Sequence, residues 1–254
     1  MTTADIAHTI FGIIGNVLGV SMFLSPVPTF VAICKRGSVE QYSAAPYLAT
    51  LMSCMVGVLY GLPMVHPNRL LVATIAGSGC ILQIIYVTLF LIFSHRIKRL
   101  KLFMCLLLEL IFITILIVVT LTVVDNLNKR SEIVGTIFVA LTILMYASPL
   151  AIMKMVMKTK SVEYMPLFIS LASFGNSVAW TTYALIRFDP FLTVSNGAGT
   201  LLAVAQLILY ATYYNSTKQQ IASREGNMEM NLSQVVVGNG GQQTKPNCSS
   251  SSLC

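Results

Sequence analysis

Two asparagines and the only tryptophan of the chain lie inside long uncharged stretches: Asn176, Trp180 and Asn196. An amide both donates and accepts hydrogen bonds, and an indole adds a flat apolar face. Because Trp180 follows Asn176 by four residues, the two share one face of a helix. Such a face suits a neutral molecule with hydroxyl and C–H groups. Two other interpretations stay open: an interhelical polar contact for the asparagines and an interfacial anchor for the tryptophan.

The composition points to lipid as the solvent of these residues. Of 254 residues, 56% are hydrophobic and 10% are charged, and the mean hydropathy is +0.78. Soluble domains carry about a quarter charged residues. A soluble enzyme, a disulfide-rich secreted domain and a disordered chain are therefore excluded. The six cysteines have no metal-ligand spacing, so we expect neither a metal nor a cofactor.

Seven stretches are long enough to cross about 30 Å of hydrocarbon as helices. Six of them contain no Asp, Glu, Lys or Arg, and the fourth contains only Glu109. The stretches are residues 9–34, 41–65, 70–94, 102–124, 133–153, 164–186 and 190–217. The sequence therefore predicts an all-α membrane protein with seven transmembrane helices.

The basic residues predict the orientation of these helices. Twelve lie in the loops after the first, third and fifth stretches and in the tail, and four lie on the opposite side. Since cytosolic loops are richer in Lys and Arg, the N-terminus is expected outside the cytosol and the C-terminus inside it. The net charge of +7 then reflects topology, and no nucleic acid partner is expected.

The first three stretches resemble the last three. Phe23–Pro26 (FLSP) and Tyr146–Pro149 (YASP) lie 123 residues apart, and so do the two copies of the tripeptide Ser-Val-Glu that begin at Ser38 and Ser161. A slip to 120 residues aligns Ala76 with Asn196. Three helices per copy and one between them make the copies parallel, which is one of the repeat patterns of transporters. We expect repeats at 8–94 and 133–215, a linker helix at 102–124 and a disordered cytosolic tail at 218–254.

With these motifs in view, the chain resembles the SWEET sugar transporters of the PQ-loop group over residues 8–215. The resemblance rests on Gly12–Asn16 (GIIGN), Leu24–Phe30 (LSPVPTF), Met145–Leu150 (MYASPL), Lys158–Glu163 (KTKSVE) and Ser195–Gly199 (SNGAG). It is similar to the plant subgroup that handles mainly hexoses. The resemblance implies facilitative, bidirectional movement of monosaccharides such as glucose, without ion coupling, by alternating access.

The resemblance also implies roles for individual residues. Substrate binding is expected from Asn196, Trp180, Asn176, Ser53, Gly57, Ala76 and Met145. The two positions opposite Trp180 and Asn196 in the first copy are small, Gly57 and Ala76, so we expect an asymmetric pocket with most hydrogen bonds from the second half. A cytosolic hinge and gate is expected from Pro26, Pro46, Pro149 and Pro166, and an extracytosolic gate from Tyr60, Tyr183 and Asp189. A static kink and a plain turn remain the alternatives for the prolines and for Asp189.

Other seven-helix classes lack support. A heterotrimer-coupled receptor would have an acid-Arg-aromatic triplet after the third helix, and a retinal protein would have a lysine in the seventh; neither occurs. The alternative that stays open is a proton-coupled carrier of amino acids or other small solutes, for which Glu109 is the candidate group. The expected partners are a hexose, membrane lipid and further copies or relatives, with a trimer among the expected oligomers. The plasma membrane is the expected location, and the vacuolar membrane is the alternative.

Overall fold

The computed structural model describes residues 3–39, 42–67, 69–163, 165 and 167–240. These residues form helices and connecting loops without a strand. The helices of the first half are α1 Thr3–Leu24, α2 Val27–Arg36, α3 Ala45–Gly61 and α4 Leu70–Phe93. The linker is α5 Arg96–Val118, which continues as a short π-helical segment, η1 Val119–Val123. The second half contains α6 Leu127–Met145, α7 Ala147–Thr159, α8 Leu167–Ile186 and α9 Pro190–Gly240.

Helices are interrupted by prolines, and end at residues with a left-handed backbone conformation, at matching places in the two halves. Pro26 separates α1 from α2, and Pro149 lies in the first turn of α7, just after the break that follows α6. Gly37 ends α2 with φ 68°, and Lys160 ends α7 with φ 54°. Both pairs are 123 residues apart. The first and fifth predicted spans are thus each built from two helices with a bend between them.

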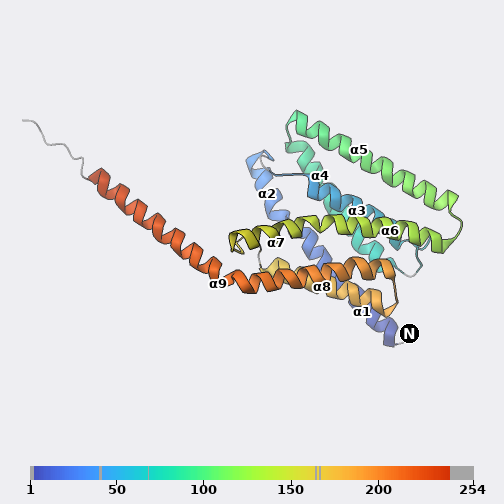
Figure 1. The fold of residues 1–254 in the computed structure, drawn as a ribbon. Coiled ribbons are helices and arrows are strands. Elements are labelled where there is room, and N and C mark those ends of the chain that lie inside the picture. The colour runs from blue at the N-terminus through green and yellow to red at the C-terminus, as the bar shows by residue number, and fades with distance from the viewer. Residues whose placement is uncertain (1–2, 40–41, 68, 164, 166, 241–254) are drawn as a thin grey trace, which may run out of the picture.

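The helices of the two halves form a ring. In the first half α4 packs between α1 and α3, and in the second half α9 packs between α6 and α8. The halves meet where α1 packs on α8 and where α3 packs on α6. The linker α5 packs on α3 and α4 from outside the ring (Figure 1). The predicted arrangement of two three-helix halves and a linker is confirmed.

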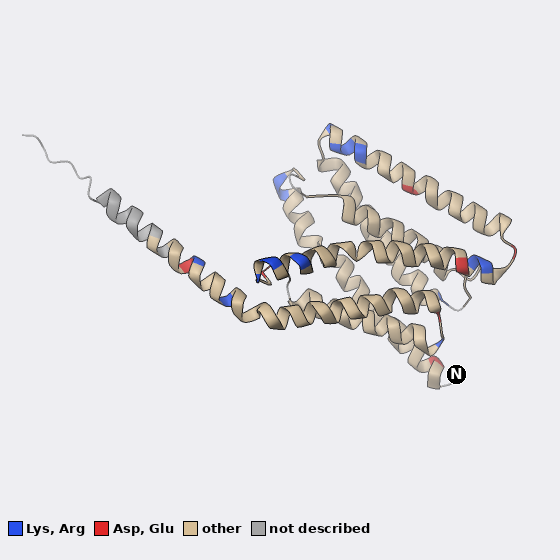
Figure 2. Cartoon of the chain, in the orientation of Figure 1, with Lys and Arg blue, Asp and Glu red and all other residues tan. Residues whose placement is uncertain are grey.

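Among the described residues, five helical stretches are long and apolar enough to cross a membrane: Thr3–Arg36, Leu70–Phe93, Arg96–Val123, Leu127–Thr159 and Pro190–Met228. The remaining predicted spans correspond to α3, which has 17 residues, and to α8, which has 20. The mean hydropathy of α8 is lowered by its serines, its threonines and Asn176. Lys and Arg residues lie near helix ends and on the outer part of α9, and the parts of the helices inside the bundle carry almost no charge (Figure 2).

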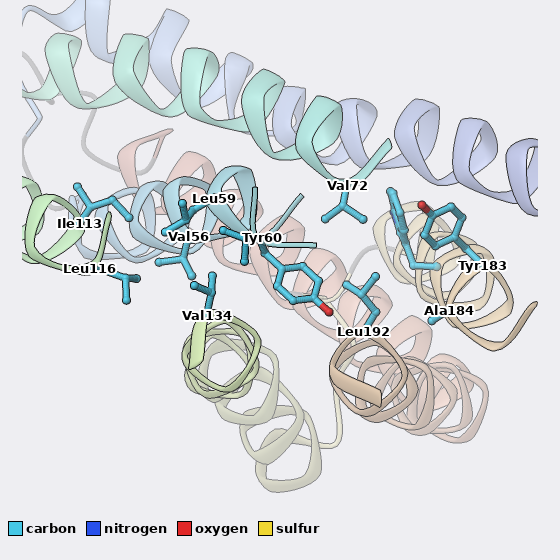
Figure 3. Packing of buried hydrophobic residues seen from close by; sticks show 12 residues of the cluster. Val56, Leu59, Tyr60, Val72, Ile113, Leu116, Val134, Tyr183, Ala184 and Leu192 are labelled. Carbon is cyan, nitrogen blue, oxygen red and sulfur yellow. The ribbon is translucent and has the colours of Figure 1, made fainter. Parts of the chain in front are cut away.

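The largest buried cluster fills the ring near the end where α1 begins. Figure 3 shows side chains of α3, α4, α5, α6, α8 and α9 meeting there around Tyr60 and Tyr183, which have no exposed surface. By contrast, most apolar side chains of α5 are exposed; Leu108, for example, is 62% exposed. In a membrane this outer surface faces lipid, so the exposure carries no penalty.

The expected disordered tail is corrected over residues 218–240, because α9 continues as one helix to Gly240 (Figure 1). Two physical reasons explain the difference. The helix is already nucleated by its packed part, so each added residue costs little. The residues that follow Thr217, such as Lys218, Gln219 and Gln220, are also good helix formers. Residues 241–254 lie outside the described part of the chain.

Candidate functional site

A cavity of about 260 Å³ lies inside the ring, and α1, α3, α4, α6, α8 and α9 all contribute to its wall. Six of the seven residues that the sequence predicted for substrate binding line it: Ser53, Ala76, Met145, Asn176, Trp180 and Asn196. These residues come from five different helices, α3, α4, α6, α8 and α9, yet the ring brings them around one space. The volume lies just below the range of about 300–1,000 Å³ typical of pockets for drug-sized ligands, so the cavity suits a small molecule.

Polar groups are distributed unequally around this cavity. The second half supplies both amides, together with Ser173 and Ser177, whereas the first half supplies Thr50 and Ser53. The Asn176 carbonyl oxygen Oδ1 is buried and has no hydrogen-bond partner among the described residues. The Asn196 amide nitrogen donates to the carbonyl of Leu192 at 3.0 Å. Asn176 therefore presents an acceptor that a bound hydroxyl group can satisfy, since a buried polar group without a partner is costly.

Trp180 lies at the boundary between this cavity and the buried cluster. Its ring packs edge-on against Tyr183, with centroids 5.1 Å apart, and only 6% of the residue is exposed. Gly15 of α1 makes room for the indole: a Cβ atom on Gly15 would lie 2.6 Å from Trp180 Nε1. The close approach of α1 and α8 thus depends on a glycine, and it holds the indole in one orientation.

Gly57 is the one predicted binding residue that does not line the cavity. A Cβ atom there would lie 3.1 Å from Phe138 Cε2 and 3.2 Å from the Cβ of Ala76. Phe138 of α6 thus lies over Gly57 and forms part of the cavity wall itself. The repeat alignment placed Gly57 opposite Trp180, but it could not show that an aromatic ring from another helix would cover this position.

Tyr146 is a wall residue that the sequence analysis did not select. Its hydroxyl donates to the carbonyl of Ser195 at 2.6 Å, which joins the α6–α7 bend to α9. The ring lines the central cavity and also a second hollow of about 330 Å³, which extends past Pro149 toward the other end of the ring. The sequence contained a signal for Tyr146, because it is the repeat partner of Phe23 at the offset of 123 residues. In the structure both residues line the central cavity.

The predicted hinge prolines lie at helix ends. Pro26 precedes α2, Pro46 lies in the first turn of α3, and Pro149 lies in the first turn of α7. A proline in the first turn removes a donor that has no intrahelical acceptor, so these positions tolerate it well. Pro166 lies outside the described residues. Pro149 lines the second hollow.

Tyr60 and Asp189 meet at the end of the ring where α1 begins, next to the buried cluster. The Tyr60 hydroxyl lies 2.9 Å from both carboxylate oxygens of Asp189 and donates its proton between them. Asp189 Oδ1 also accepts from the backbone N–H groups of Phe191 and Leu192, both at 3.1 Å, and so caps α9. The buried Arg69 completes the site, with Nε 3.2 Å from Asp189 Oδ2. We call Tyr60, Arg69, Tyr183 and Asp189 the closed end.

Tyr183 joins this group through ring contacts. Its ring stacks on the ring of His8 at 3.9 Å, and the Arg69 guanidinium carbon lies 5.6 Å from its centroid. Arg69 also donates to the carbonyl of Arg187 at 2.7 Å. The structure therefore brings all three predicted gate residues together and adds Arg69, which sequence reasoning missed because it is one base in a short loop.

His66 borders the closed end from the same α3–α4 loop. Burial lowers the pKa of its imidazole, Asp189 raises it, and Arg69 lowers it again, with a net lowering. His66 is therefore neutral at pH 7 and above.

Glu109 lies away from the cavity. It is half-buried on α5, outside the ring, and among the described residues no ion pair involves it. Its carboxylate oxygen Oε2 is buried without a hydrogen-bond partner in the described part of the chain.

Comparison with known proteins identifies the family. The profile of a family described as "Sugar efflux transporter for intercellular exchange" matches residues 9–98 and 132–218, which are the two halves without the linker. The chain belongs to the SWEET family. It is 52% identical over 225 residues to bidirectional sugar transporter SWEET4 of Oryza sativa, with 89% of this chain and 87% of that protein covered. It is 48% identical over 242 residues to SWEET7 of Arabidopsis thaliana, with 94% of each covered.

A solved structure of a eukaryotic SWEET transporter has the same fold. The TM-score is 0.82 at 37% identity, and the match covers 84% of this chain and all of that one. The chain is thus a member of a transporter family and not an enzyme.

Proposed function

We propose that this SWEET-family chain is a facilitative, bidirectional transporter of monosaccharides such as glucose, working by alternating access. One observation carries the proposal: the ring of two similar halves encloses a small cavity lined by amides, hydroxyls and an indole, and none of the described residues of its wall is charged. The relatives named above are described as bidirectional sugar transporters.

The wall of the cavity matches the chemistry of a sugar. Asn176, Asn196 and the serines of α8 provide donors and acceptors for hydroxyl groups, and Trp180 provides an apolar face for ring C–H groups. Because the described wall residues are uncharged, the cavity suits a neutral ligand, which needs no counter-ion. The second half provides most of these groups, so it sets the orientation of the bound sugar.

Alternating access requires the cavity to open at one end while it is closed at the other. The closed end is sealed by Tyr60, Tyr183 and Asp189, each without exposed surface. The second hollow continues from the cavity toward the opposite end, along α7 and α8. We expect the halves to rock about the bends at Pro26 and Pro149, so that the closed end opens as the opposite end closes.

The orientation, location and assembly are part of the same proposal. The excess of basic residues at the end opposite the closed end supports a cytosolic position for that end and an extracytosolic position for Tyr60 and Asp189. The plasma membrane is the proposed location, with the vacuolar membrane as the alternative. We expect an oligomer, a trimer among its forms, in which each chain holds its own pathway, because a single chain forms the complete ring.

The test is uptake of radiolabelled glucose and sucrose by cells that lack hexose transporters, with and without a proton ionophore. Saturable glucose uptake that is insensitive to the ionophore is the expected result. Ionophore-sensitive uptake that is lost in Glu109→Gln would replace the proposal with proton coupling. Correctly inserted protein that moves neither sugar would overturn the substrate class.

A further inference from the structure

A short hydrogen bond joins the two halves beside the closed end. His66 lies in the loop between α3 and α4, and Ser131 lies in the second turn of α6. Their side chains meet at 2.6 Å between His66 Nδ1 and Ser131 Oγ. Ser131 is 8% exposed and the His66 side chain is 26% exposed, so water competes little for this bond.

The imidazole is held on three sides. One face stacks on the ring of Tyr60, with centroids 5.2 Å apart and planes 15° apart. Its Nε2 atom points toward Asp189, 3.8 Å from Oδ2, which is too long for a hydrogen bond but close enough for electrostatic attraction. The tautomer with hydrogen on Nε2 satisfies both neighbours, because Nδ1 then accepts the proton of the Ser131 hydroxyl.

The residue before Ser131 holds the same loop. Arg130 donates from one guanidinium nitrogen to the carbonyl of Met64 at 3.2 Å, and from Nε to the carbonyl of Val124 at 2.6 Å. Arg130 and Ser131, two successive residues of α6, therefore both form hydrogen bonds to the α3–α4 loop. Both bonds join the second half to the first.

We propose that the His66–Ser131 pair is a second latch of the closed end, beside the Tyr60–Asp189 contact and touching it, and that it sets how often this end opens. The inference rests on the proposed alternating-access function. If this end opens, the α3–α4 loop of the first half moves away from α6 and α9 of the second half. The bond between His66 and Ser131 crosses that boundary and breaks with the motion.

Loss of the latch shifts the population toward the open form. A neutral hydrogen bond contributes about 0.5–1.5 kcal/mol, which corresponds to a change of about two- to tenfold in the ratio of open to closed forms. The apparent affinity for a ligand that binds only the open form increases by the same factor while that form is rare. A variant that only impaired folding would lower the maximal rate, because less protein is active, and would leave this apparent affinity unchanged.

The first experiment is a double-mutant cycle on radiolabelled glucose influx. Ser131→Ala removes the hydroxyl, and His66→Phe keeps a ring on Tyr60 but removes Nδ1. We expect each variant to lower the KM for external glucose about two- to tenfold. The double variant should match the stronger single variant, because both lose one shared bond. Ser131→Thr, which keeps the hydroxyl, should restore the original KM.

Matched controls are the exposed Ser223 and His95, both outside the closed end. Ser223→Ala and His95→Phe should leave the KM unchanged. The latch is overturned if the KM of Ser131→Ala equals that of the unmodified protein, or if the effects of the two single variants simply add.

A second measurement does not depend on sugar transport. Spin labels at Met64→Cys and Glu132→Cys, in a background without native cysteines, report the separation of the loop from α6 in reconstituted protein. A larger long-distance population in the Ser131→Ala background is the expected result. An unchanged distance distribution would overturn the latch even if the substrate class of the proposed function proved wrong.

Discussion

At the scale of single residues, the proposed binding site combines two amides with the hydroxyl groups of several helices. Asn176 and Asn196 place amides at the wall of the cavity, where the proposed function has each of them bond to a sugar hydroxyl. The side-chain amide nitrogen of Asn196 donates a hydrogen bond to the backbone carbonyl of Leu192, which fixes the side chain. The side-chain oxygen of Asn196 is then left for a ligand. Removing such a group affects binding more than folding.

Asn196→Ala is therefore expected to raise the KM for glucose influx about three- to tenfold, which corresponds to one lost hydrogen bond. Uptake kinetics in hexose-deficient cells measure this change, with membrane expression of the variant as the control. An unchanged KM would mean that Asn196 does not touch the substrate.

The closed end gives a second prediction at this scale. Asp189 is completely buried and compensates the buried Arg69, so Asp189→Asn leaves a cation without its partner and should lower the stability of the protein by ~3 kcal/mol. Tyr60→Phe removes only the hydroxyl and should cost less, because Arg69 and two backbone N–H groups still bind Asp189. Apparent melting temperatures of the purified variants check the order, which would be contradicted if Tyr60→Phe were the more damaging change.

At the scale of elements, helix ends define the bends that the two halves share. Gly37 ends α2 in the left-handed region, and its N–H donates to the carbonyl of Ile33 at 2.9 Å. The repeat partner of Gly37, Lys160, has the same conformation with a side chain, and its ammonium group donates to the Tyr213 hydroxyl at 2.9 Å. One half thus ends its helix with a glycine, and the other half ends it with a residue bound to α9.

Gly37→Ala tests the importance of this helix end. A Cβ atom there meets nothing within 4 Å, so the change acts only through backbone strain and should cost about 1 kcal/mol. Gly77 is the matched control, because it lies within α4 with equally open surroundings. Gly77→Ala should be neutral or stabilising by up to about 1 kcal/mol, since alanine favours a helix interior. Thermal unfolding of both variants distinguishes them, and equal shifts would argue against strain.

At the scale of the whole molecule, the proposed function depends on motion between two halves that touch along α1–α8 and α3–α6. The closed end joins the halves through side chains, whereas the cavity continues into the second hollow toward the other end. The bends at Pro26 and Pro149 lie near that other end, where the movement of helix segments would open or close the path.

Pro149→Ala should straighten the junction of α6 and α7, because the alanine N–H, which has no acceptor within α7, can donate to the carbonyl of Met145 at the end of α6. We expect a several-fold lower maximal rate of glucose uptake with little change in KM, since the cavity wall stays intact. Initial-rate measurements over a range of glucose concentrations test this. A changed KM with an unchanged maximal rate would instead place Pro149 in substrate binding.

The sequence by itself determined the helical membrane class, the duplicated halves and the linker, because these depend on local hydropathy and on motifs at constant spacing. It also selected six residues that line the cavity, and Tyr60, Tyr183 and Asp189 of the closed end. The roles of these residues in transport remain predictions.

Only the tertiary structure decided which helices are neighbours. Phe138 covers Gly57, Arg69 pairs with Asp189, and His66 meets Ser131 across distances of 81, 120 and 65 residues in the chain. The continuation of α9 beyond the bundle was likewise missed, because polar composition does not show that a packed helix already provides the nucleus. Local patterns predict which segments become helices, but contacts between distant segments depend on how the side chains of all six ring helices fit together.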